Sequence, residues 1–237
     1  MLKKIAPVFT AAILGLVVFT SCGKAAIKNN IESSGSSSLI SSSAPTSSSV
    51  SSQPVNASST GSSYPDPEKD PLYVRAYSYY AADKFDDAVN VCNQALAANP
   101  NCFWAYNVKG IAVYFANGNS VADSCLALID KSIAINPNYS YGYFNKALIE
   151  KGLKENDESI SDFNKVLSLK PGDTWSYYGI STIYADTNQT ELALQYLKLA
   201  IDTNPSAVKA QVKDDIYRHF SVLKNDPRFQ ALVNGNS

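Results

Sequence analysis

Side chains that commonly carry catalysis or bind metals are scarce in this sequence. It has one histidine, His219, and four cysteines, and no two cysteines form a CxxC pair. A metal site or a catalytic triad needs several such residues at defined spacings, and His219 has no partner at ligand spacing. No P-loop, GxSxG or HExxH motif is present. We therefore expect a solvated His219 and no enzyme: no catalytic residue, no metal, no cofactor and no small-molecule substrate.

An excess of charge of either sign is also missing. The formal net charge is −1, with 20 Lys and Arg against 21 Asp and Glu, and no basic stripe occurs. Proteins bind nucleic acid largely by neutralising phosphates with clustered Lys and Arg. Nucleic acid is therefore not an expected partner.

Hydrophobic runs are short, and the most apolar one covers residues 5–19. A helix that spans a bilayer needs about 20 apolar residues. Lys3 and Lys4 precede the run, and small residues lead directly from it to Cys22. This arrangement resembles a bacterial lipoprotein signal peptide over residues 1–21, with Cys22 lipidated as the mature N-terminus. Ordinary secretion and retention of the uncleaved segment are the alternatives.

The segment after Cys22 is dominated by serine, which takes 17 of the 31 positions from 33 to 63. No apolar face can be drawn there, so folding could not offset the entropy lost on ordering. We expect residues 22–66 to be a disordered, lipid-anchored linker. It would hold the rest of the chain off the extracytoplasmic face of the cell membrane.

The other cysteines are Cys92, Cys102 and Cys125, an odd number for an exported chain, so at least one thiol is expected to be unpaired. Cysteine often serves as a small buried hydrophobe, which is the interpretation we favour for Cys92 and Cys125. A disulfide between Cys92 and Cys102 stays open.

Four prolines divide the rest of the chain at nearly constant intervals. Pro100, Pro137, Pro171 and Pro205 are separated by 37, 34 and 34 residues, and each follows Asn or Lys. A fixed period of this length indicates one copied supersecondary unit, and therefore a stack of units. Each proline is expected to end a helix, because the residue before proline is displaced from the α region.

Each unit carries apolar and small residues at helical spacing. Twelve, eight and five residues before the prolines, the pattern is small, bulky, small, which lets a neighbouring helix approach closely. The positions are Ala88, Cys125, Ser159 and Ala193; Cys92, Ile129, Phe163 and Leu197; and Ala95, Ser132, Val166 and Ala200. An earlier helix in each unit has its own small position, at Ala76, Gly110, Ala147 and Ser181.

This pattern resembles the tetratricopeptide repeat, a pair of helices about 34 residues long. The resemblance implies an all-α fold, a right-handed α-solenoid of about four helix pairs over residues 67–205. Capping helices are expected over 206–237, where Val208, Val212, Ile216, Phe220 and Leu223 form one apolar stripe. Glu150 departs from the family pattern because it takes a position where an aromatic residue usually stands.

In this family the first helix of each pair lines a concave groove. Carried over position by position, the resemblance implies a partner-binding groove made of Tyr73, Tyr77, Tyr80, Trp104, Asn107, Tyr114, Tyr141, Phe144, Asn145, Trp175 and Tyr178. Trp104, Tyr141 and Trp175 share one position in successive repeats, which predicts an exposed aromatic ladder. Packing of several of these rings between adjacent first helices is the alternative. The Lys, Arg and Asn clamp with which some relatives bind acidic C-termini is not expected, since only Asn145 agrees with it.

Two functions from different classes follow from these features. The first is a membrane-tethered scaffold that binds a protein or peptide segment of an envelope complex, because Tyr and Trp dominate binding hot spots. An apolar or proline-containing segment suits aromatic walls best. The second is a cell-wall glycan-binding lipoprotein, in which the rings stack on sugars and Asn107 and Asn145 supply hydrogen bonds.

Overall fold

A computed structural model describes residues 64–235 and is built of helices, with no strand in that range. Its helices are the 3-10 helix η1 (Pro67–Lys69), α1 (Pro71–Ala81), α2 (Phe85–Ala98), α3 (Phe103–Asn117), the 3-10 helix η2 (Gly118–Val121), α4 (Ala122–Ile135), α5 (Ser140–Leu153), α6 (Asn156–Leu169), α7 (Thr174–Asp186), α8 (Thr190–Thr203), α9 (Pro205–Asp215) and α10 (Pro227–Asn234). The predicted signal peptide, Cys22 and nearly all of the predicted linker lie outside the described residues.

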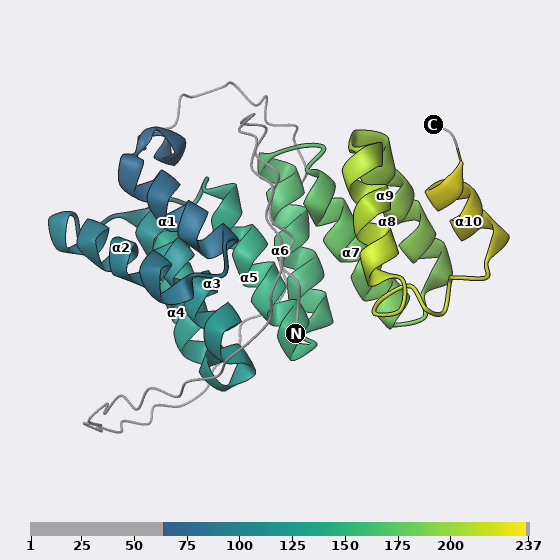
Figure 1. The fold of residues 1–237 in the computed structure, drawn as a ribbon, viewed down its shortest axis with the longest axis horizontal. Coiled ribbons are helices and arrows are strands. Elements are labelled where there is room, and N and C mark those ends of the chain that lie inside the picture. Colours follow the sequence, from purple (N-terminus) through teal and green to yellow (C-terminus); the bar gives the residue numbers. More distant parts are fainter. Residues whose placement is uncertain (1–63, 236–237) are drawn as a thin grey trace, which may run out of the picture. The chain divides into compact units, whose positions relative to one another are not determined.

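The helices from α1 to α8 form four antiparallel pairs, and each pair packs on the next in sequence order (Figure 1). The small positions lie at the helix contacts and are buried. At Gly110 in α3, an added Cβ would lie 2.9 Å from the carbonyl oxygen of Cys125 and 2.9 Å from Cγ1 of Ile129, both in α4. Only hydrogen fits there, so the small positions set how closely paired helices approach. The predicted α-solenoid of helix pairs is confirmed.

The prolines act as the sequence predicts. Helices α2, α4, α6 and α8 each end two residues before one of them. Pro205 has a second role, since it is also the first residue of α9. The side chain of Asn204 caps that helix by accepting a hydrogen bond from the backbone N–H of Ala207 at 3.2 Å.

The first helices of the pairs, α1, α3, α5 and α7, contact one another along the array. Contact between successive second helices is weaker. The first helices therefore pack more closely on one another than the second helices do. We call the face that the first helices form the inner face.

The C-terminal stripe is buried but is not one helix. Helix α9 ends at Asp215, and residues 216–225 continue as turns before α10 begins. Phe220 and Leu223 are nevertheless fully buried, and Phe220 packs on Tyr178 of α7 and Phe229 of α10. The apolar spacing thus predicted the burial correctly, whereas the expected helix through Leu223 was wrong.

Candidate functional site

A hollow lies on the inner face among α1, α3 and α5, and we call it the tyrosine hollow. It brings together seven of the eleven predicted groove residues and three further ones. Its lining consists of Tyr73, Tyr77, Tyr80, Asn107, Tyr141, Phe144 and Asn145, with Val108, Ile111 and Tyr139. Residues from three successive repeats therefore line one space, with aromatic rings from the first and the third.

Phenol groups dominate the tyrosine hollow. The rings of Tyr73 and Tyr77 are stacked with centroids 6.0 Å apart, and those of Tyr139 and Tyr141 are tilted at 5.8 Å. Loss of solvent on burial raises the pKa of Tyr73 to about 12. Burial likewise raises the pKa of Tyr77, Tyr139 and Tyr141. These hydroxyls therefore stay protonated and neutral throughout the physiological pH range.

Two carboxamides connect the repeats at this hollow. Asn145 Nδ2 of α5 donates a hydrogen bond to Asn107 Oδ1 of α3 at 3.2 Å. Asn107 is 1% exposed, so the bond fixes its orientation inside the array. Asn145 is only half-buried, and it presents the polar edge of the hollow.

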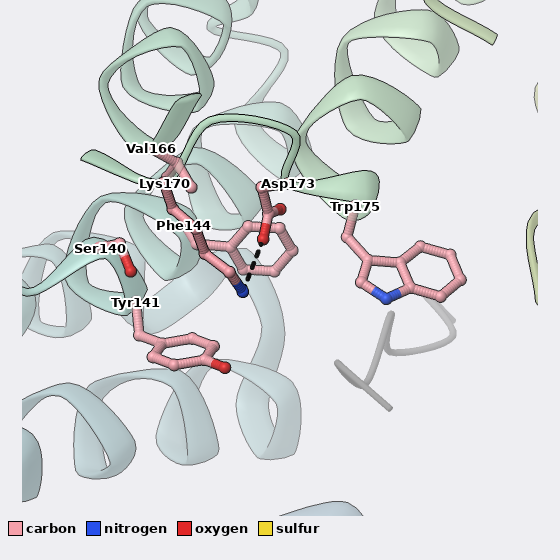
Figure 2. A pocket seen from close by; sticks show the side chains of 7 residues that line it. All are labelled: Ser140, Tyr141, Phe144, Val166, Lys170, Asp173 and Trp175. Atoms are coloured by element: carbon pink, nitrogen blue, oxygen red, sulfur yellow. Dashed lines mark ion pairs between the residues drawn. The ribbon is translucent and has the colours of Figure 1, made fainter. Parts of the chain in front are cut away.

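A second hollow follows at the start of α5 and α7, and we call it the tryptophan hollow (Figure 2). Its lining is Ser140, Tyr141, Phe144, Val166, Lys170, Asp173 and Trp175. Lys170 Nζ lies 3.1 Å from Asp173 Oδ2 and 5.9 Å from the centroid of the Tyr141 ring. Tyr141 and Phe144 line both hollows, so the two form one strip across the inner face from α1 to α7.

The expectation of an exposed aromatic ladder is wrong at both tryptophans, since Trp104 is 4% exposed and Trp175 is 9% exposed. Trp104 Nε1 donates a hydrogen bond to Asp70 Oδ2 at 3.1 Å. Its ring meets Tyr73 edge-on at 5.6 Å. The Trp104 indole is therefore held between α3 and the start of α1, behind Tyr73, and it does not line the tyrosine hollow.

Tyr114 and Tyr178 are also buried and lie outside the two hollows. The hydroxyl of Tyr114 donates to Asn119 Oδ1 at 2.9 Å, and Asn119 Nδ2 donates to the carbonyl oxygen of Gly152 in the next repeat. The hydroxyl of Tyr178 donates to Asp215 Oδ2 at 2.9 Å. Like Trp104, these rings pack between neighbouring repeats, which is the alternative that the sequence left open.

A side-chain hydrogen bond spans each interface between successive first helices, and a fourth joins α7 to α9. The bonds are Trp104 to Asp70, Asn145 to Asn107, Lys151 to Thr182 and Tyr178 to Asp215. Partners in each bond are 31 to 38 residues apart, which is about one repeat. We infer that these bonds hold neighbouring repeats in register, because a buried polar group without its partner is costly.

Tyr139, Lys170 and Asp173 line the hollows and were missed in the sequence. All three lie in the loops that precede α5 and α7, whereas the repeat pattern describes only positions within helices. Asp173 is nevertheless a recognisable N-cap, since its Oδ1 accepts a hydrogen bond from the backbone N–H of Ser176 at 2.9 Å. That signal would have placed it at the start of α7.

Glu150, the departure from the family pattern, is 5% exposed and lies in an acidic cluster of α4, α5 and α6. Lys146 Nζ is 3.0 Å from Asp130 Oδ1 and 3.9 Å from Asp162 Oδ2. Burial, followed by the charge of Asp162, raises the pKa of Glu150 to about 7, and Lys146 opposes the shift. Glu155 adds a smaller contribution that raises it further.

The raised pKa of Glu150 predicts that the free energy of unfolding falls as pH rises. The folded pKa of Glu150 exceeds its unfolded value of about 4.3, so the folded state binds the proton more tightly between these values. The free energy of unfolding should therefore decrease from about pH 4.5 to about pH 7. Glu150→Gln, which keeps the shape without the charge, should stabilise the protein by about 1–3 kcal/mol at pH 8 and by little at pH 4.5.

Urea unfolding of wild type and variant at several pH values measures this difference. Glu158→Gln, at an exposed position of the neighbouring helix α6, is the matched control and should show no such pH dependence. A Glu150→Gln difference that is the same at pH 4.5 and pH 8 would contradict the assignment.

His219 is not the solvated residue that the sequence predicted. Its side chain is 12% exposed, and its Nδ1 lies 2.7 Å from Asp186 Oδ2.

Cys92, Cys102 and Cys125 are buried free thiols, so the Cys92–Cys102 disulfide is absent from the structure. Burial raises the pKa of Cys92 to about 12 and that of Cys102 to about 11, which disfavours the reactive thiolate.

Residues 64–235 show neither a metal-binding cluster nor a helix that could span a membrane. No group of three or more His, Cys, Asp or Glu there is arranged to hold a metal ion. None of the helices in that part of the chain is long and apolar enough to cross a bilayer.

Comparison with known proteins agrees with this architecture. A sequence profile of the tetratricopeptide repeat matches residues 140–173 and 176–206. A thermophilic TPR protein of Thermus thermophilus is similar in structure, with a TM-score of 0.55 and 17% identity over 64% of this chain and 82% of that chain. MamA of Desulfovibrio magneticus has a TM-score of 0.48 and 20% identity over 60% of this chain and 77% of that chain. No curated protein sequence matches.

The profile matches two units of the array, and all four observed helix pairs have the fold that the resemblance to the tetratricopeptide repeat implied. Arrays of this class generally act as scaffolds for protein–protein interaction and not as enzymes.

Proposed function

We propose that this array is a membrane-tethered scaffold that binds an extended segment of a partner protein along the two hollows of its inner face. The observation that carries the proposal is the gathering of Tyr73, Tyr77, Tyr141 and Phe144 around one space. These rings come from separate repeats, and the shared Tyr141 and Phe144 extend the space to Trp175. A strip of this kind suits a segment that crosses the first helices one after another.

The side chains of the strip are suited to binding without a large change of shape. Tyr and Trp offer large contact areas with few rotatable bonds, so little conformational entropy is lost when they bind. Buried neighbours already hold many of the rings: Phe144, for example, packs edge-on against the fully buried Phe163 at 5.6 Å. Preorganisation of this kind increases affinity because fewer groups must be ordered on binding.

The tether rests on the sequence. Residues 1–21 have the pattern of a lipoprotein signal peptide, and residues 22–66 have the composition of a flexible linker. We assign the lipid to Cys22 and the array to the extracytoplasmic face of the cell membrane. A flexible linker of about 45 residues has a typical end-to-end distance of about 35–40 Å, which lets the array reach a partner in an envelope complex.

The groove assignment predicts that Tyr141→Ala combined with Trp175→Ala removes partner binding. The two rings belong to the hollows, and losing two aromatic contacts should weaken affinity by at least about 100-fold. Quantitative co-purification from membranes of the native host measures the result. Tyr217→Ala is the control, because Tyr217 is 82% exposed and lies in the turns after α9. An unchanged set of partners in the double variant would contradict the assignment.

One observation favours the second candidate, binding of cell-wall glycan. Neutral hydroxyl and carboxamide groups line the tyrosine hollow together with ring faces, and sugars use both kinds of contact. Co-sedimentation with purified cell wall separates the candidates: a glycan-binding array would pellet with the wall, and a peptide-binding scaffold would stay in solution.

A further inference from the structure

A groove outside the two hollows lies between the turn that leads into α6 and the turn that joins α7 to α8. We call it the turn groove. Its volume is about 560 Å³, and its lining includes Lys154, Glu155, Asp157, Glu158, Ile160 and Tyr184. Ligand sites usually measure about 300–1,000 Å³. The turn groove therefore has space for a side chain of a partner.

Negative charge is in excess in the turn groove. Its carboxylates are those of Glu155, Asp157 and Glu158, and Lys154 is the cation that opposes them. All three acidic residues are exposed, and none of their carboxylates makes a hydrogen bond or an ion pair with another residue within 64–235. Glu155 is the N-cap of α6, yet its side chain makes no capping hydrogen bond. These oxygens are therefore available to a cationic ligand.

Acidic residues at the start of a helix are common, because they complement the helix dipole. An independent indication of a cationic ligand comes from the first and fourth repeats. Tyr79 and Tyr184 each precede the proline of their repeat by 21 residues. The fifth residue after each tyrosine donates its backbone N–H to the tyrosine carbonyl oxygen, at 2.9 Å and 2.8 Å. The two turns therefore share this backbone arrangement.

The two repeats differ in what covers the tyrosine ring. In the first repeat the fifth residue is Lys84, and its Nζ lies 6.0 Å from the centroid of the Tyr79 ring. In the fourth repeat it is Gln189, and within residues 64–235 no Lys or Arg lies over the Tyr184 ring. Tyr184 is half-buried and lines the turn groove. The fourth repeat thus has the aromatic part of a cation–π pair and lacks the cation.

We propose that the turn groove binds an arginine side chain of a partner protein. The guanidinium takes the place over Tyr184 that Lys84 Nζ takes over Tyr79, and its N–H groups donate to the carboxylates at the start of α6. Its aliphatic stem packs on Ile160. The turn groove shares no lining residue with the two hollows, so this contact does not depend on the inner-face binding proposed above.

Arginine suits these walls better than lysine. Its guanidinium is planar, so it stacks on an aromatic ring while its edge donates to carboxylates, and it is less strongly hydrated than an ammonium. Lysine offers a compact charge without a planar face. The carboxylates therefore select a cationic partner, and the ring selects arginine.

Calorimetric titration of the full chain with acetylated, amidated tetra-arginine tests this proposal. Saturable binding is expected, at least about threefold tighter than for tetralysine of equal charge, because only the guanidinium stacks on Tyr184. Absence of saturable binding, or equal affinity for the two peptides, would overturn the proposal.

Neutral substitutions at the start of α6 locate the binding. A triple variant removes the three charges of the turn groove and keeps the shapes of the side chains: Glu155→Gln, Asp157→Asn and Glu158→Gln. It should weaken tetra-arginine binding at least about tenfold, because the charge-assisted hydrogen bonds are lost. These positions are exposed, so the variant should fold normally.

A second triple variant is the matched control. It removes the same number of charges from exposed positions at the starts of α2 and α4: Asp86→Asn, Asp87→Asn and Asp123→Asn. Tetra-arginine binding should weaken by less than about twofold, because solvent and salt screen distant charges. Equal losses in the two triple variants would show that net charge alone attracts the peptide, and would overturn the proposal.

One further variant separates this surface from the inner face. Tyr141→Ala combined with Trp175→Ala changes both hollows and should leave tetra-arginine binding unchanged, since neither residue lines the turn groove. A loss of tetra-arginine binding in this double variant would overturn the placement in the turn groove. Loss of co-purified partners in the same variant, with tetra-arginine binding intact, would support both surfaces.

Discussion

Replacing Phe163 by alanine is expected to lower the free energy of unfolding by about 3–5 kcal/mol, the usual range for a fully buried phenylalanine. Phe163 lies in α6 and is 0% exposed. Its ring packs on Phe144 of α5, and Gly179 of α7 makes room for it, since a Cβ at Gly179 would lie 2.5 Å from the ring. One side chain therefore joins three helices of two repeats. Its loss leaves a cavity that these helices cannot close without moving.

Urea unfolding followed by circular dichroism measures the loss, with Leu192→Ala as control. Leu192 is 36% exposed in α8, so its substitution should cost well under half as much. Hydrogen exchange adds a spatial test: protection should fall most in α5, α6 and α7, because each repeat of a stack contacts only its neighbours. A loss below about 1 kcal/mol for Phe163→Ala would contradict the proposed packing.

Replacing Cys22 by serine is expected to move the protein from the membrane fraction to the soluble fraction. Serine cannot carry the thioether-linked lipid, and in the proposed anchor the acyl chains supply the affinity for the bilayer. Fractionation of host cells with immunoblotting measures the shift, and incorporation of labelled palmitate should disappear in parallel.

Cys102→Ala is the matched control for this experiment. It removes a cysteine from the loop before α3, and the protein should remain with the membrane and keep its label. Unchanged fractionation of Cys22→Ser would refute lipidation at this position, and release of both variants would point to misfolding in place of a lost anchor.

The helices and their pairing could be predicted from the sequence because the signals are local. The proline two residues after each second helix shows where that helix ends. The small residues at spacings of four and three show where a neighbouring helix can approach closely. The same spacing places residues such as Tyr77 of α1 and Tyr141 of α5 on the same side of their first helices. Their gathering around one hollow follows from the repeat.

Burial of individual rings could not be predicted in this way. The position of a residue in the repeat determines which side of its helix the residue occupies. It does not determine which residues of the neighbouring repeats pack against it. Trp104 is covered because Asp70, 34 residues earlier, accepts its N–H, and Tyr178 because Asp215 lies across the next interface. Tyr139 was missed for the opposite reason, since it lies in a loop and reaches the hollow from outside the helical pattern.

Cross-linking from the inner face tests the central claim most directly. A photoreactive phenylalanine analogue would replace Tyr141 in one variant of the full chain and the exposed Tyr217 in another, both expressed in the native host. If the inner face binds a protein segment, irradiation should produce a discrete cross-linked protein from position 141 and none from position 217. Equal products from both positions, or none from position 141, would contradict the account.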